Sequence, residues 1–114
     1  MLTIYHNPRC SKSRQTLALI EETNTDVEIV EYLKNPPSIE TLANILGLLA
    51  VEPRAMMRTK EDEYKQQNLS DKNISNDELL AAMAATPKLI ERPIVVSGNK
   101  ACIGRPPENV LALL

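Results

Sequence analysis

The spacing of apolar residues in the first third of the chain predicts two strands joined by a helix. Residues 2–5 form a short apolar run typical of a strand, and the next segment carries Leu17 and Ile20 at helical spacing. Over residues 26–32, apolar and polar positions alternate imperfectly, which predicts a second strand with one face more exposed to solvent than the other. This part is therefore expected to form a β-α-β unit with parallel strands.

Three helices are expected in the middle of the chain. Residues 36–37 are both proline and stop regular structure, and Ser38 can cap the helix that follows. The buried stripe of that helix is expected at Leu42, Ile45, Leu46 and Leu49. The strongly charged residues 52–67 predict a second, more exposed helix. Residues 75–78 carry the Ser and Glu of a capping box, which opens a third helix that should end before Pro87.

The C-terminal part predicts a hairpin and a last helix. Residues 93–96 and 100–103 flank Ser97-Gly98-Asn99, a compact turn signal, and the helix is expected to begin at residues 106–107. The complete order predicts an α/β fold in which a mixed four-stranded sheet is covered by helices. Thioredoxin-like folds have this layout. We therefore expect a single thioredoxin-like domain over residues 1–114, with a central helical insert at about 38–86.

Composition narrows the classes of partner. The formal net charge of -2 argues against nucleic acid or an anionic membrane as the main partner. No leader-like or membrane-spanning run is found, and the two cysteines lie far apart, which favours a reducing compartment; we expect a cytoplasmic protein. His6 is the single histidine, so no metal site is expected.

Cys10 is the strongest candidate for a reactive residue. It lies between the first strand and the first helix, where free N–H groups and the helix dipole favour a thiolate. Arg9, Lys12 and Arg14 add positive charge nearby. A helix N-terminus also binds anions, so this turn predicts chemistry on an oxyanion or on another thiol. Cys102, in contrast, lies in a short apolar strand, and we expect it to be structural.

Three arginines outside this turn stand at predicted junctions between elements. Arg58 follows an apolar run, Arg92 precedes the most apolar strand, and Arg105 lies between the hairpin and the last helix. Taken singly, each is typical of a surface charge. The planar guanidinium group binds tetrahedral oxyanions through two parallel hydrogen bonds. Together with Cys10, the three therefore predict a shared anion site.

These motifs jointly resemble the glutaredoxin-coupled arsenate reductase family. The resemblance covers the full chain and rests on His6-Asn7-Pro8-Arg9-Cys10-Ser11-Lys12-Ser13-Arg14, Arg58, Glu91-Arg92-Pro93-Ile94-Val95 and Ile103-Gly104-Arg105-Pro106-Pro107. Members of that family have a thioredoxin-like fold with a helical insert. The best-known arsenate reductases carry Gly-Thr after the cysteine, where this chain has Ser11-Lys12, which still offers N–H groups, a hydroxyl and one more positive charge.

The resemblance implies a role for each candidate residue. Cys10 would be the nucleophile that attacks arsenate or a related oxyanion, and Arg58, Arg92 and Arg105 would bind the oxyanion and stabilise the adduct. His6 would match the family histidine that helps to hold Cys10 as a thiolate. Glutathione would attack the adduct as co-substrate and glutaredoxin would restore the enzyme, giving arsenite. No bound cofactor is implied, and we expect a monomer.

Other functions remain open from the same residues. Phosphatase-like arsenate reductases place an arginine six positions after the cysteine, and here that position is Thr16, which disfavours this class. A monothiol glutaredoxin-like protein fits Cys10 and Ser13 in C-x-x-S spacing but leaves the three arginines without a role. Spx-type regulators share the fold, bind RNA polymerase and commonly sense oxidants through C-x-x-C, whose second thiol Ser13 removes. An enzyme is ranked first, and a regulatory or binding protein second.

Overall fold

A computed structural model describes residues 2–114 and divides the chain into two compact units. Unit 1 is built from both ends of the chain, up to Asn35 and from Arg92 onward. Unit 2 is the segment Pro36–Glu91 between them. It includes the predicted helical insert of about 38–86 and extends beyond it at both ends. That the whole chain behaves as one domain stays a prediction.

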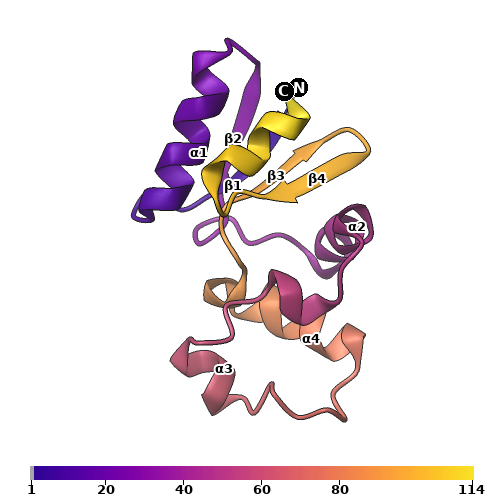
Figure 1. The fold of residues 1–114 in the computed structure, drawn as a ribbon. Helices are drawn as coiled ribbons and strands as arrows, with labels where there is room; N and C mark the ends of the chain where they lie inside the picture. Colours follow the sequence, from indigo (N-terminus) through magenta and orange to yellow (C-terminus); the bar gives the residue numbers. More distant parts are fainter. Residues whose placement is uncertain (1) are drawn as a thin grey trace. The chain divides into compact units, whose positions relative to one another are not determined.

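Unit 1 contains the sheet (Figure 1). Its strands are β1 (Leu2–His6), β2 (Val27–Glu31), β3 (Ile94–Ser97) and β4 (Lys100–Ile103), in the spatial order β2-β1-β3-β4. β1 runs parallel to β2 and antiparallel to β3, and β3 pairs antiparallel with β4. The predicted mixed four-stranded sheet is confirmed, and so is the hairpin, whose turn has Gly98 at φ 57°.

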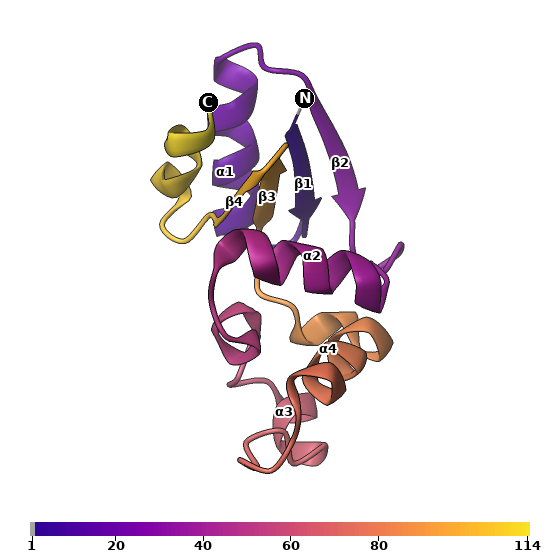
Figure 2. The same cartoon turned by 90° about the vertical axis from the view of Figure 1, so that its right-hand side faces the viewer.

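One face of the sheet is covered by α1 (Ser11–Glu22) and by the C-terminal 3₁₀ segment η3 (Pro107–Leu113), which lie side by side (Figure 2). The last predicted helix thus forms, but as a 3₁₀ helix. The buried core between these layers consists of Leu2, Ile4, Ile20, Val95 and Val110. Ile29, by contrast, is 47% exposed because β2 is an edge strand of the sheet.

Unit 2 is helical: α2 (Ile39–Leu49), α3 (Asp62–Gln66) and α4 (Asn76–Ala85), with the 3₁₀ segments η1 (Pro53–Met56) and η2 (Pro87–Leu89). Both predicted caps form: the Ser38 hydroxyl accepts the N–H of Thr41 at 3.1 Å, and Ser75 and Glu78 make a reciprocal capping box. α2 packs against α4. Within residues 2–114, no helix is long and apolar enough to cross a membrane.

The prediction of one exposed helix over residues 52–67 is wrong. η1 and α3 are separate segments, and the chain between them is extended at Met57, which forms an isolated antiparallel bridge with Ile90. The N–H of Arg58 donates to the carbonyl of Leu89 at 2.7 Å, so backbone groups that a helix would pair internally are paired across unit 2. Met57 is only 3% exposed. Met56 and Met57 are buried against residues 89–91, and this tertiary packing outweighs the helical propensity of the segment.

Gly104 lies in the corner of the chain directly after β4, and this corner packs closely against α1. Its N–H donates to the carbonyl of Pro93 at 2.9 Å, and its carbonyl lies 3.3 Å from the hydroxyl of Thr16. A Cβ atom at this position would lie 2.5 Å from Thr16 Oγ1 and 2.9 Å from Pro93 Cγ. No side chain can therefore be accommodated between α1 and this corner without moving one of them.

Gly104→Ala is expected to lower the free energy of unfolding by about 1–3 kcal/mol, the usual result of forcing a methyl group into a packed site. Chemical denaturation measures the change. Gly47→Ala is the matched control: within the described chain, nothing lies within 4 Å of a Cβ there, and the residue is inside α2. It should stabilise the protein by roughly 0.5–1 kcal/mol. Equal stability of the two variants would show that the corner is not tightly packed.

Candidate active site

Cys10 is the N-cap of α1, as the sequence predicts. Its backbone is extended, with φ -95° and ψ 122°, and its N–H donates to the carbonyl of Asn7 at 3.0 Å, which closes the turn after β1. Its carbonyl accepts the first helical hydrogen bond, from Arg14 N–H at 3.0 Å. Cys10 is partly buried and lies at the positive end of the helix.

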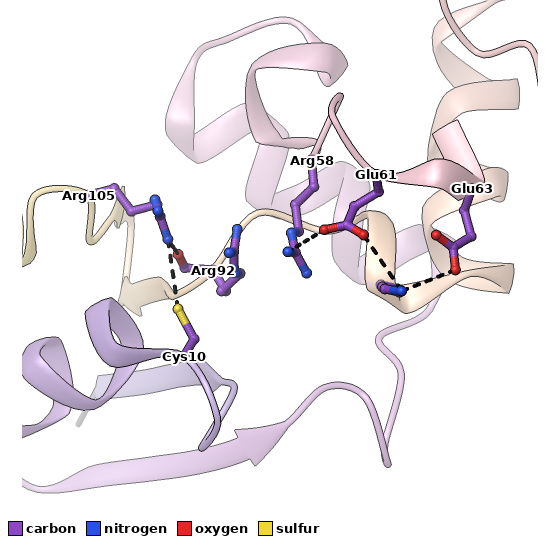
Figure 3. A network of polar contacts seen from close by, with 7 residues as sticks. Cys10, Arg58, Glu61, Glu63, Arg92 and Arg105 are labelled. Atoms are coloured by element: carbon purple, nitrogen blue, oxygen red, sulfur yellow. Dashed lines mark hydrogen bonds and ion pairs between the residues drawn. The ribbon is translucent and has the colours of Figure 1, made fainter. Parts of the chain in front are cut away.

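The structure brings Arg92 and Arg105 to the same end of unit 1 as Cys10. β3 and β4 are antiparallel, with Ile94 opposite Ile103, so the residue before β3 and the residue after β4 lie at the same end of the sheet. Each arginine is followed by a cis-proline. Arg105 Nη1 lies 3.8 Å from Cys10 Sγ, within hydrogen-bond range of sulfur, and 3.4 Å from the carbonyl of Arg92 (Figure 3).

The surroundings of Cys10 favour its thiolate. Burial alone would raise the pKa of the thiol. The N–H groups of Ser13 and Lys12, the charge of Arg92 and the hydrogen bond from Arg105 act in the opposite direction, and together they bring the pKa below its usual value. A cysteine with a lowered pKa at a helix N-terminus, beside guanidinium groups, can act as a nucleophile toward an anionic substrate.

His6 contacts Ser13. Its Nδ1 lies 2.6 Å from Ser13 Oγ, and the same oxygen accepts the N–H of Asn7 at 3.0 Å. Burial, reinforced by the charge of Arg14 and opposed by Glu31, lowers the pKa of His6, so the imidazole is neutral at pH 7. The contacts tie the end of β1 and the loop before Cys10 to the first turn of α1. The predicted role of His6 in holding the thiolate would then act through this loop.

Arg58 belongs to unit 2, where it forms an ion pair with Glu61 (Figure 3). Lys88 Nζ bridges the two neighbouring carboxylates, at 3.6 Å from Glu61 Oε2 and 3.4 Å from Glu63 Oε2. Arg58 and Glu61 are both about four-fifths buried, at 20% and 19% exposure of their side chains. The guanidinium is thus held by a charged partner within its own unit, and its predicted place beside Cys10 stays a prediction.

Ser13 and Glu61 contribute contacts that the sequence analysis did not assign. Ser13 follows Cys10 by three residues, the spacing at which a side chain in the first helical turn meets the preceding loop. Glu61 follows Arg58 by three residues, but this i, i+3 spacing is common on any polar surface.

Ser11 and Lys12, the departure from the family pattern, are exposed in the first turn of α1. Within residues 2–114, no group of three or more His, Cys, Asp or Glu could hold a metal ion.

Cys102 occupies a different environment. It lies in β4, opposite Val95, and packs against the core of unit 1. Burial raises the pKa of its thiol to about 11. At neutral pH this thiol is protonated, and a protonated thiol is a poor nucleophile.

The alkylation rate of Cys10 is expected to rise with a midpoint below about 8.5, the ordinary pKa of a free cysteine. Iodoacetamide labelling against pH, followed by mass spectrometry of the modified peptide, measures it, and Cys102→Ser is the control that leaves one thiol. Arg105→Ala should move the midpoint upward because a hydrogen bond to the thiolate is lost. A midpoint at or above that of free cysteine would contradict this electrostatic account.

Comparison with known proteins identifies the family. The model of the ArsC family matches residues 5–113. The uncharacterized protein YfgD of Escherichia coli strain K12 is 52% identical over 97% of this chain and 94% of its own length. An arsenate reductase of Neisseria meningitidis is 48% identical, over 99% of this chain and 97% of its own. The solved structure of an arsenate reductase from Vibrio cholerae, 54% identical, matches with a TM-score of 0.97 over 99% of this chain and 97% of that one. The predicted thioredoxin-like fold and family resemblance are therefore confirmed, and the chain belongs to the ArsC family.

Proposed function

We propose that this protein is an arsenate reductase that uses Cys10 as nucleophile and draws its electrons from glutathione and glutaredoxin. The observation that carries the proposal is the contact of Arg105 with Cys10: a guanidinium lies 3.8 Å from a sulfur whose pKa is lowered at a helix N-terminus. This is the arrangement that attack of a thiolate on an oxyanion requires. The names of the similar proteins from N. meningitidis and V. cholerae support arsenate as that oxyanion.

In the proposed reaction, the Cys10 sulfur bonds to arsenic and one arsenate oxygen leaves as water. The sulfur of glutathione then replaces a second oxygen, which also leaves as water. The glutaredoxin thiolate attacks the glutathione sulfur, and the electron pair of the arsenic–sulfur bond stays on arsenic, which is reduced from the +5 to the +3 state. Water finally releases arsenite from Cys10. The net reaction converts arsenate and two thiols into arsenite, one mixed disulfide and one water.

The arginines would act on the charge that changes during these steps. Arg92 and Arg105 lie at the end of the sheet where Cys10 lies, and each can donate two parallel N–H groups to an oxyanion. Arg58 is proposed as the third ligand, on the basis of its match to the family motif. His6 and Ser13 would hold the loop that presents the sulfur, because they join the end of β1 to α1.

Arsenate-dependent oxidation of NADPH, coupled through glutathione reductase and glutaredoxin, tests the proposal. Wild type should turn over and Cys10→Ser should not. Arg92→Ala, Arg105→Ala and Arg58→Ala should each lower turnover about 10²-fold or more, as expected when one donor to a developing charge is removed. Arg105→Lys should recover only part of this loss because an ammonium group lacks the planar fork.

Lys100→Ala is the control for removing a positive charge, since this exposed residue lies at the start of β4, in the hairpin. It should reduce arsenate at the wild-type rate. Circular dichroism of each variant separates loss of chemistry from loss of fold. Absence of any arsenate-dependent oxidation by folded wild type would reject the proposed function.

Cys102 is expected to be dispensable for turnover, because glutathione supplies the second thiol and the pKa of Cys102 is raised to about 11. Cys102→Ser should keep most of the activity in the same assay and lose about 1 kcal/mol of unfolding free energy, the usual size of a single core change. A folded but inactive Cys102→Ser protein would instead indicate a mechanism that forms an internal disulfide.

A further inference from the structure

A pocket of about 250 Å³ lies beside the turn that carries Cys10, within unit 1. Its walls are residues 6–9, which lead from the end of β1 to Cys10, together with Glu31, Leu33 and Lys34 at the end of β2. We refer to it as the β1–β2 pocket. The carboxyl ends of the parallel strands β1 and β2 meet at this end of the sheet, and in open α/β sheets ligands bind outside the carboxyl ends of the strands.

The pocket and the arginines lie on different sides of the Cys10 turn. Arg92 precedes β3 and Arg105 follows β4, so both come from the β3–β4 side of β1. The pocket is built from the β2 side. Arg9 lines it and directly precedes Cys10 in the chain, so the pocket borders the turn that carries the sulfur.

The charges of the pocket fit the carboxylate and the ammonium of a small zwitterion. Arg9 and Lys34 supply two cations, Glu31 supplies one carboxylate, and the pKa of His6 is lowered so that it adds no charge at neutral pH. Lys34 Nζ lies 3.6 Å from Glu31 Oε1, with side-chain exposures of 76% and 40%. Such an exposed pair is weak, so a ligand carboxylate and a ligand ammonium can replace it at little cost.

The pocket also offers apolar surface. Pro8 and Leu33 are exposed, and Leu33 retains 46% of its accessible surface. Methylene groups of a ligand can cover this surface while its charged end contacts Arg9 and Lys34. The volume is below the roughly 300–1,000 Å³ of pockets that enclose a whole drug-sized ligand. It therefore suits one end of a short peptide better than a complete molecule.

We propose that the β1–β2 pocket binds the γ-glutamyl end of glutathione, whose α-carboxylate would contact Arg9 and Lys34 and whose ammonium would contact Glu31. The γ-glutamyl linkage runs through the side-chain carboxyl of the glutamate, and the central cysteine would extend from the pocket toward Cys10. The oxyanion would be bound from the arginine side. This inference rests on the proposed function, since it assigns a place to the thiol co-substrate of that reaction.

Binding is tested first without chemistry. Cys10→Ser protein labelled with ¹⁵N is titrated with S-methylglutathione, which cannot react. Saturable shifts of the amides of Glu31, Leu33 and Lys34 are expected, and Lys34→Glu in the same background should weaken binding about tenfold. Lys100→Glu makes the same charge change in the hairpin and should leave the binding curve unchanged. Shifts confined to the ends of β3 and β4, or no saturable shift, would overturn the proposal.

Steady-state kinetics then assigns the pocket to one substrate. Lys34→Glu should raise the apparent KM for glutathione about tenfold without changing the apparent KM for arsenate. γ-Glutamylcysteine should replace glutathione with a similar KM, whereas cysteinylglycine should not saturate. Equal KM values for the two dipeptides would overturn the assignment of the γ-glutamyl end.

If S-methylglutathione binds in the pocket but no arsenate is reduced, the proposed function fails while the pocket assignment stands. If arsenate is reduced and Lys34→Glu has the wild-type glutathione KM, the pocket assignment fails alone.

Discussion

The close approach of Gly104 to Thr16 is the contact on which the geometry around Cys10 depends. It sets the distance between α1 and the corner after β4, because a Cβ at Gly104 would lie 2.5 Å from Thr16 Oγ1. Cys10 caps one end of that helix, and Arg105 follows Gly104 directly. Residues 95 positions apart in the chain are thereby held 3.8 Å apart at the sulfur. Since misplacement by about 1 Å can cost 10²-fold in rate, tight packing here would serve the proposed reaction as well as stability.

The two cysteines show that position, and not residue type, decides reactivity. Burial raises the pKa of both thiols. At Cys102 it acts alone, and the pKa reaches about 11. At Cys10 it is outweighed by helix N–H groups, by the charge of Arg92 and by the hydrogen bond from Arg105. The same strand-to-helix turn therefore lowers the pKa of the Cys10 thiol and, as a helix N-terminus, has the positive potential that favours an anion.

Local signals explain which parts of the fold could be predicted. The capping box at residues 75–78 and the Gly98 turn each arise within a few residues, and the β-α-β pattern lies within one continuous segment, residues 2–31; each forms as expected. The segment 52–67 was misassigned because pairing of Met57 with Ile90 is a contact between distant residues. The contact of Ser13 with His6 was missed because it forms only when the turn at residues 7–10 brings the end of β1 against the start of α1. The motif around Cys10 predicted the strand-to-helix turn, but neither the contact of His6 with Ser13 nor the ion pair of Arg58 with Glu61.

In the proposed reaction, the sheet order would place the two substrates on different sides of the Cys10 turn. Arsenate and a glutathione thiolate are both negative, so a single positive site would let them compete for the same groups. Because Cys10 follows β1, a central strand, it has β3 and β4 on one side and β2 on the other. The side formed by β3 and β4 presents Arg92 and Arg105, and the β2 side presents a pocket with both cations and a carboxylate. A planar fork suits a tetrahedral oxyanion, whereas a mixed-charge pocket suits an amino-acid end, so in the proposed reaction each reagent would approach the Cys10 turn from its own side.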